Sequence, residues 1–305
     1  MRIAYLGNFK YPWCSEEHFC KTLEQLGCQI TRLQEDEVSI DQIVNTANQN
    51  DLFGWTRTYG MLKGNGFEML KRITVPTFSV HLDYYFDISR ERQMSADPFW
   101  FTDYVFQPDG DNVERFKELG MNAYWSPPAV FKDGAYLLDL PKTHDIVFVG
   151  SSAGYHAEWP WRNQLINWLS TTYGSRFELY PQGEAIREEK LNELYASTKV
   201  VIGDSIMADR NATYTTDRIF ETTGRGGFIV YPAIPWLVDI FDGKLITYKV
   251  GDFDGLRATI DYYLTHDDDR ELSRKLCHEI TKADHTYHQR FEKILEIIKN
   301  GKVLI

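Results

Sequence analysis

Residues 215–232 read Thr-Thr-Asp-Arg-Ile-Phe-Glu-Thr-Thr-Gly-Arg-Gly-Gly-Phe-Ile-Val-Tyr-Pro. A polar cluster opens the stretch, an amphipathic segment follows, and a run of glycines separates that segment from four apolar or aromatic residues. Glycines after a periodic segment end a helix, and a short apolar run after a turn is typical of a buried strand. The stretch therefore predicts a helix over 217–223 and a strand over 227–231.

The same stretch has the chemistry of an anion site. We expect Thr215 or Thr216 to cap the helix, which leaves backbone N–H groups at its start open to a phosphate. Arg218 adds a fixed positive charge, and Glu221 lies about one turn later on the same side, where it could accept hydrogen bonds from ribose hydroxyls. The alternative interpretation is a helix end followed by a core strand, with no ligand.

Strand patterns alternate with helix patterns along the rest of the chain, which indicates α/β layers around parallel sheets. A proline-bearing, irregular segment at 126–144 is the expected hinge between two such series. We expect strands at 2–6, 28–33, 51–56, 74–80, 104–107, 122–125, 145–149, 177–180 and 199–203 besides 227–231. Helices are expected at 15–27, 39–47, 66–72, 112–119, 161–173, 188–196, 254–265, 269–283 and 285–299 besides 217–223.

Composition limits the class of protein. The chain has 305 residues, which fits two domains, and 43% hydrophobic residues, which excludes disorder. No apolar run reaches the ~20 residues of a membrane helix, and the apolar start is too short for a signal peptide. We therefore expect a cytoplasmic protein, and expect its four cysteines to be free thiols. The net charge of −11 argues against broad nonspecific binding to nucleic acid.

The residues Arg218-Ile219-Phe220-Glu221, followed by glycines and Phe228-Ile229-Val230, resemble a signature of the spore-maturation-protein (CgeB-like) group of glycosyltransferases. The resemblance continues at 145–151, 251–256, 262–264 and 285–291 and covers roughly the C-terminal half. It implies the GT-B fold, two Rossmann-like α/β domains facing across a cleft, and a nucleotide-sugar donor. We accordingly expect an acceptor domain at 1–141, a donor domain at 142–284, and a helix at 285–305 that returns to the first domain.

The second domain is expected to hold the donor at the ends of its strands. Gly150 and Ser151 follow one strand directly, and small residues there let the backbone approach a phosphate. Arg162 matches an arginine that often follows this loop in the resembled group, and Asp204 leaves another strand end. With Thr216, Arg218 and Glu221 these residues form the expected donor site. The alternatives are a surface charge for Arg162 and a connecting loop around Asp204.

The first domain is expected to supply the base and to hold the acceptor. His81 and Asp83 follow a strand and lie on one face of an extended segment, so they could act as a base and its orienting partner. The alternative is that Asp83 caps a helix at 84–92. Gly7 and Asn8 end the first strand and Arg57 follows the third, so all three are candidate cleft residues.

The sequence thus predicts a glycosyltransferase that needs no metal and no cofactor besides its nucleotide sugar, expected to be a UDP-sugar. Thr213 stands where many retaining enzymes of this fold carry a first glutamate, so the stereochemical outcome stays open. The acceptor also stays open among a small molecule, a glycan, a protein and modified DNA, as does the oligomeric state. Two alternatives remain: a viral-type DNA glycosyltransferase acting on a modified pyrimidine, and a non-catalytic nucleotide-sugar-binding protein.

Overall fold

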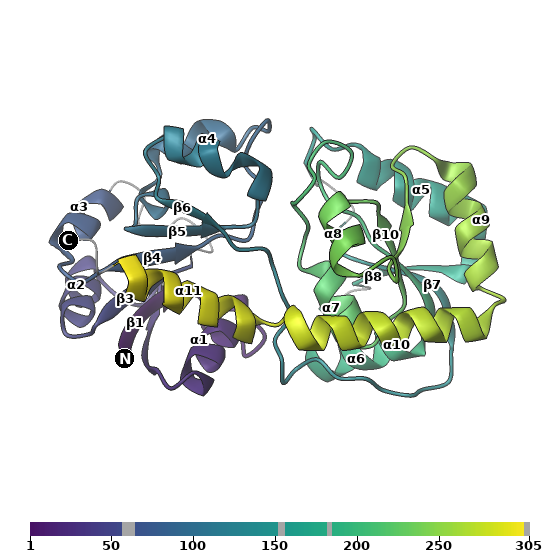
Figure 1. The fold of residues 1–305 in the computed structure, drawn as a ribbon, viewed down its shortest axis with the longest axis horizontal. Coiled ribbons are helices and arrows are strands. Elements are labelled where there is room, and N and C mark those ends of the chain that lie inside the picture. Colours follow the sequence, from purple (N-terminus) through teal and green to yellow (C-terminus); the bar gives the residue numbers. More distant parts are fainter. Residues whose placement is uncertain (57–64, 152–155, 182–184, 302–305) are drawn as a thin grey trace. The chain divides into compact units, whose positions relative to one another are not determined.

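The computed structural model describes residues 1–56, 65–151, 156–181 and 185–301 (Figure 1). The chain forms two compact units. Unit 1 comprises Met1–Pro127 and Tyr287–Ile305, and unit 2 comprises Pro128–Thr286. The change from one unit to the other therefore falls at Pro127 and Pro128, at the start of the expected hinge segment, and the end of the chain belongs to unit 1.

Unit 1 is built on a six-stranded sheet whose neighbouring strands are all parallel, in the order β2-β1-β3-β4-β5-β6. Parallel strands buried on both faces carry continuous apolar runs, and every residue of β3, β4 and β5 is buried. The strands are β1 (Arg2–Gly7), β2 (Gln29–Gln34), β3 (Leu52–Trp55), β4 (Thr77–Val80), β5 (Tyr104–Gln107) and β6 (Ala123–Trp125).

Five α-helices accompany this sheet in the described part of unit 1. Helix α2 begins with the capping box that its sequence predicts. The Ser39 hydroxyl accepts from the Gln42 backbone N–H, and the Gln42 side-chain oxygen accepts from the Ser39 backbone N–H. The helices are α1 (Ser15–Gln25), α2 (Ile40–Asn48), α3 (Gly66–Arg72), α4 (Val113–Glu118) and α11 (Tyr287–Gly301).

The C-terminal helix α11 packs against α1 within unit 1. Phe19 of α1 is 1% exposed, and its ring lies 4.7 Å from the ring of Tyr287 and 5.1 Å from that of Phe291. Buried aromatic rings at these separations stabilise an interface through both area and ring geometry. This aromatic contact therefore fixes the last helix to the first one, although nearly the whole chain separates them in sequence.

Unit 2 is built on a five-stranded sheet, again with parallel neighbours, in the order β11-β10-β9-β7-β8. Its strands are β7 (His144–Val149), β8 (Phe177–Tyr180), β9 (Thr198–Ile202), β10 (Ile229–Pro232) and β11 (Ile246–Tyr248). The helices are α5 (Trp161–Tyr173), α6 (Glu188–Ser197), α7 (Arg218–Gly224), α8 (Pro235–Ile240), α9 (Phe253–Tyr263) and α10 (Asp267–Asp284).

Two local interpretations, the threonine cap of α7 and the alternative helix at 84–92, are wrong, and two short elements were missed. Helix α7 begins at Arg218 after Asp217, with no side-chain cap, because the hydroxyls of Thr215 and Thr216 bond to Tyr231 instead. Residues 84–90 form no helix, and a 3₁₀-helix starts only at Glu91. The sequence interpretation also missed α8 and β11, which are too short to show a clear period, although Pro at the first position of α8 was a usable signal.

Among the described residues, none of the helices combines the length and the apolar character that crossing a membrane requires.

We predict that Phe19→Ala destabilises unit 1 by about 3–5 kcal/mol, because it leaves a cavity between α1 and α11. Urea unfolding followed by circular dichroism measures the change. Leu119→Ala is the control, since Leu119 is 44% exposed and its truncation should cost less than about 0.5 kcal/mol. Equal unfolding midpoints for Phe19→Ala and the wild type would show that α11 does not depend on this contact.

Candidate functional site

Unit 2 has a topological switch point between β7 and β9. β8 lies on one outer side of this pair, and β10 and β11 lie on the other. Connections from the two central strands diverge there, and open α/β sheets bind ligands at the carboxyl ends of such strands. Gly150 and Ser151 follow β7, while Gly203 and Asp204 follow β9, so the fold brings these sequence-predicted segments to one edge of the sheet.

Arg218, the first residue of α7, joins the ends of these two strands. Its Nε donates to the carbonyl oxygen of Val149 at 2.7 Å, and an NH1 hydrogen is donated to the carbonyl oxygen of Asp204 at 3.0 Å. Its guanidinium carbon also lies 5.2 Å from the centre of the Phe148 ring. Burial lowers the pKa of Arg218, but neighbouring groups, among them Tyr231, Asp217 and Asp204, together raise it by more, so the guanidinium remains positively charged.

Gly150 makes room for that guanidinium. A side chain at Gly150 would place its Cβ 2.5 Å from NH2 of Arg218, and the residue has φ +151°. Both the contact and the backbone conformation exclude larger residues. The sequence predicted a glycine that lets the backbone approach a ligand. The structure shows that this glycine lets an arginine lie against the end of β7, and its approach to a ligand stays a prediction.

Asp204 is fully buried and forms an ion pair with Arg162. Its Oδ2 accepts from Nε of Arg162 at 2.8 Å, and its Oδ1 accepts from the indole N–H of Trp159 at 3.1 Å. Arg162 is only 2% exposed, so it is not the surface charge considered as an alternative. These contacts direct Arg162 and the Asp204 carboxylate toward each other, and a direct contact of either with a donor stays a prediction.

The sequence interpretation missed two tyrosine hydroxyls at this edge of the sheet. The Tyr231 hydroxyl lies 2.9 Å from Oγ1 of Thr215 and 3.1 Å from Oγ1 of Thr216, and the Tyr248 hydroxyl donates to the Gly203 carbonyl at 2.9 Å. Burial raises the pKa of both tyrosines, so both stay protonated and able to donate. A buried tyrosine hydroxyl needs a hydrogen-bond partner, so the tyrosine at position 231 of an expected buried strand could have indicated a polar contact.

Glu221 is held by an arginine one turn further along. Its Oε2 accepts from Nε of Arg225 at 2.6 Å, and its side chain is 18% exposed. Arg225 is almost fully buried and also donates to the Gly134 carbonyl at 2.7 Å and to Oδ1 of Asn192 at 2.9 Å. Arg225 therefore fixes the position of the Glu221 carboxylate. The sequence interpretation did not predict this role of Arg225.

Unit 1 has a second switch point, between β1 and β3. Gly7 ends β1, and a Cβ there would lie 2.7 Å from Cγ of Glu16, so the glycine allows α1 to approach closely. The side chain of Asn8 accepts from the backbone N–H of Lys10 at 3.1 Å. Thr56 follows β3 and its hydroxyl lies 2.7 Å from that of Tyr5. Arg57 lies outside the described residues.

His81 and Asp83 lie in different surroundings beyond β4. His81 is 3% exposed, its Nε2 lies 3.0 Å from the Ser79 hydroxyl, and its ring stacks on Trp100 at 3.6 Å between centroids. The Asp83 side chain is 62% exposed and pairs with Arg90 at 2.9 Å. The interpretation of these residues as a base and its orienting partner therefore stays a prediction.

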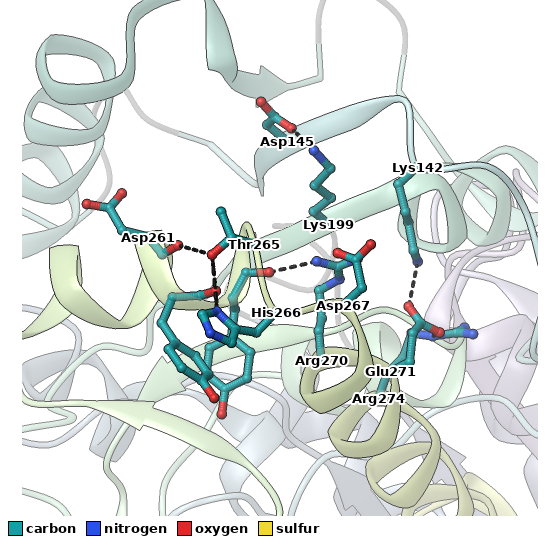
Figure 2. Close-up of polar contacts among 12 residues, drawn as sticks. Lys142, Asp145, Lys199, Asp261, Thr265, His266, Asp267, Arg270, Glu271 and Arg274 are labelled. Carbon is teal, nitrogen blue, oxygen red and sulfur yellow. Dashed lines mark hydrogen bonds and ion pairs between the residues drawn. The ribbon is translucent and has the colours of Figure 1, made fainter.

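The opposite, amino edge of the unit 2 sheet carries a network of paired charges (Figure 2). Lys199 contacts Asp145 at 2.7 Å, near the starts of β9 and β7. Glu271 of α10 pairs with Arg274 at 2.7 Å and with Lys142 at 3.4 Å. Burial lowers the pKa of Lys142 although Glu271 opposes this effect. The network ties α10 to the sheet, and its cations lie in direct ion pairs with carboxylates.

Within the described ranges, no group of three or more His, Cys, Asp or Glu side chains is arranged to hold a metal ion. None of the four cysteines is joined in a disulfide.

Solved structures similar to this chain share its fold. A structure of Alr3699/HepE from Anabaena in complex with UDP and glucose has a TM-score of 0.66 and 12% identity, over 98% of this chain and 100% of that one. Sucrose-phosphate synthase from Thermosynechococcus elongatus has a TM-score of 0.66 and 10% identity, with complete coverage of both chains. A glycosyltransferase from Rickettsia africae has a TM-score of 0.58 and 11% identity, over 98% of each chain.

No curated protein sequence matches the chain. A family model described as glycosyl transferase-like matches residues 138–296, which is just over half of the chain and includes Gly150, Asp204 and Arg218. The two parallel α/β sheets match the GT-B architecture of the similar structures over nearly their full length. The chain therefore belongs to the glycosyl transferase-like family and has the GT-B fold.

Proposed function

We propose that this protein transfers a sugar from a nucleoside diphosphate sugar, expected to be a UDP-sugar, to a hydroxyl group of an acceptor. The observation that carries the proposal is the Arg218 guanidinium, anchored on the carbonyls that end β7 and β9 at the switch point. A similar structure, that of Alr3699/HepE, was solved with UDP and glucose, which supports this choice of donor.

The charge of Arg218 suits the leaving diphosphate. Its hydrogen-bond partners at Val149 and Asp204 are neutral carbonyl oxygens, and the Asp204 carboxylate is paired with Arg162. The positive charge of Arg218 is therefore not cancelled by these contacts. A cation that is fixed before reaction stabilises developing negative charge without the cost of reorganisation. We propose that Arg218 performs this task and that no bound metal is needed.

The other donor contacts follow from position. We propose that the backbones of Gly150, Ser151 and Thr216 face the phosphates, since they lie beside Arg218 at the strand ends. Glu221, held by Arg225 at 2.6 Å, is proposed to accept the ribose hydroxyls. Asp204 and Arg162 are proposed to support this site by fixing the loop whose carbonyl binds Arg218.

Unit 1 is proposed to supply the base. Asp83 is exposed enough to meet a substrate, and its contact with Arg90 holds the carboxylate. An aspartate can remove the proton from an acceptor hydroxyl as that hydroxyl attacks the anomeric carbon. The buried His81 is proposed to fix the segment that carries Asp83, while Gly7, Asn8 and Arg57 are proposed to border the acceptor.

We further propose that the chain belongs to the CgeB-like group within the family. The support is the segment Arg218–Gly224, which forms helix α7, with the following Phe228-Ile229-Val230, of which Ile229 and Val230 begin β10.

We predict that Arg218→Ala weakens UDP binding at least ~30-fold, because a fixed, buried cation that binds a diphosphate contributes ~2 kcal/mol or more. Isothermal titration with UDP, with and without EDTA, measures the change, and EDTA should have no effect. Arg176→Ala is the control, since Arg176 is half exposed and pairs with Asp145 at the amino edge. UDP binding by Arg218→Ala at wild-type affinity would rule out this donor site.

Gly150→Ala should also weaken UDP binding, by about tenfold or more, because the new Cβ displaces the Arg218 guanidinium. The same titration measures it. Gly174→Ala is the matched control: Gly174 also has a positive φ, of +55°, but nothing lies within 4 Å of its Cβ position. The control should lower the melting temperature and leave UDP affinity intact. Equal UDP affinities for both variants would contradict the role of Gly150.

Asp83→Asn should reduce turnover by a factor of about 10² or more, the usual contribution of a general base, while UDP affinity stays unchanged. Acceptor-dependent release of UDP from UDP-glucose measures turnover. Asp41→Asn is the control, because Asp41 is likewise an exposed aspartate of unit 1 paired with an arginine, Arg72. Undiminished turnover by Asp83→Asn would remove Asp83 as the base and leave the donor site standing.

A further inference from the structure

Two aromatic rings stand exposed on the loop that follows β1. Tyr11 is 51% exposed and Trp13 is 38% exposed. Their ring centroids are 5.0 Å apart and their planes are inclined by 16°, so the rings are stacked on each other. Large aromatic side chains in solvent contribute little to a core, and a grouped pair indicates a binding surface. We call this pair the aromatic platform.

The loop under the platform is held by hydrogen bonds. The backbone N–H of Phe9 donates to Oε1 of Gln34 at 2.6 Å, and that of Lys10 donates to Oδ1 of Asn8 at 3.1 Å. The N–H of Cys14 donates to the carbonyl of Tyr11 at 3.2 Å, which closes a turn around the platform. Rings on such a loop lose little conformational freedom when a ligand stacks on them.

The platform lies where a ligand of unit 1 is expected. The loop leaves the carboxyl end of β1, directly after Gly7, and β1 with β3 forms the switch point of unit 1. Open parallel sheets bind ligands at this edge. The aromatic platform is therefore on the same edge as the residues proposed to border the acceptor.

The charges around the platform are mainly negative. Glu16 and Glu17 begin α1, just after Trp13, but Glu16 is buried and Glu17 pairs with Arg32. Residues 35–37, Glu-Asp-Glu, follow the end of β2, which pairs with the end of β1. Glu35 is buried, so Asp36 and Glu37 are the exposed carboxylates of this segment. The platform's own lysine, Lys10, forms an ion pair with Asp36. Carboxylates repel the phosphates of a nucleic acid, but they accept hydrogen bonds from sugar hydroxyls.

We propose that the acceptor is a neutral carbohydrate, one sugar ring of which stacks on the Tyr11–Trp13 platform. The C–H groups on the face of a sugar ring carry slight positive charge, and they are attracted to the negative face of an aromatic ring. The sugar hydroxyls at the ring edge are assigned to the exposed carboxylates Asp36 and Glu37, as in sites that combine aromatic faces with a few polar groups. The inference rests on the proposed function, because it names the acceptor class of that enzyme.

An array of neutral and anionic glycans, probed with the full-length protein in saturating UDP, tests the proposal. We expect neutral glycans to bind and anionic ones to bind more weakly. Tyr11→Ala and Trp13→Ala should each weaken the best neutral glycan about five- to tenfold, while Tyr11→Phe and Trp13→Phe keep affinity within about threefold, because a ring face remains. Phe67→Ala, which removes another exposed aromatic ring of unit 1, should have no effect.

Three results would overturn the proposal: no glycan binds, the alanine variants bind glycans like the wild type, or a fluorescent single-stranded DNA binds in a platform-dependent way instead. UDP titration separates failure of the acceptor proposal from failure of the proposed function. The platform variants should bind UDP like the wild type, so loss of glycan binding with intact UDP binding concerns the acceptor alone. A wild-type protein that binds no UDP would instead remove the proposed function.

Discussion

Unit 2 depends on one interaction, the pair of hydrogen bonds from a charged guanidinium to two strand-end carbonyls. Arg218 donates to Val149 at the end of β7 and to Asp204 just beyond β9. Carbonyls at the ends of parallel strands have no further strand to bond, and a buried carbonyl left without a partner costs free energy. The arginine satisfies two of them and brings a positive charge to the switch point.

Other features of unit 2 follow from that arrangement. Position 150 must be glycine, because any Cβ would meet the guanidinium. The loop that offers the Asp204 carbonyl must be rigid, and the buried ion pair of its carboxylate with Arg162, reinforced by Trp159, makes it so. Breaking a buried pair leaves an uncompensated charge, so this support is strict. The charges at the amino edge of the sheet pair with one another and stabilise the packing of α10.

Unit 1 also has a parallel sheet with a switch point, but the side chains at the carboxyl edge of its sheet are chemically different. The loop after the carboxyl end of β1 carries two exposed, stacked aromatic rings, rather than an anchored arginine. One sheet edge thus suits a phosphate and the other suits the face and hydroxyls of a neutral ring. A transferase that joins a nucleotide sugar to a carbohydrate needs these two kinds of surface. The chemical difference between the two units therefore supports the proposed division into donor and acceptor binding.

The sequence alone determined the α/β class and much of the local structure. The elements at 66–72, 104–107, 161–173 and 177–180 lie where the pattern predicted them, and Ser39 caps its helix as expected. These features depend on neighbours within a few residues, which periodicity and capping rules describe. The strand order and the partners of Arg162 and Thr215 were decided only by the tertiary structure. Arg162 meets Asp204 across 42 positions of sequence, and Thr215 meets Tyr231 rather than the start of α7. Such contacts depend on which strands become neighbours, and no local pattern records that choice.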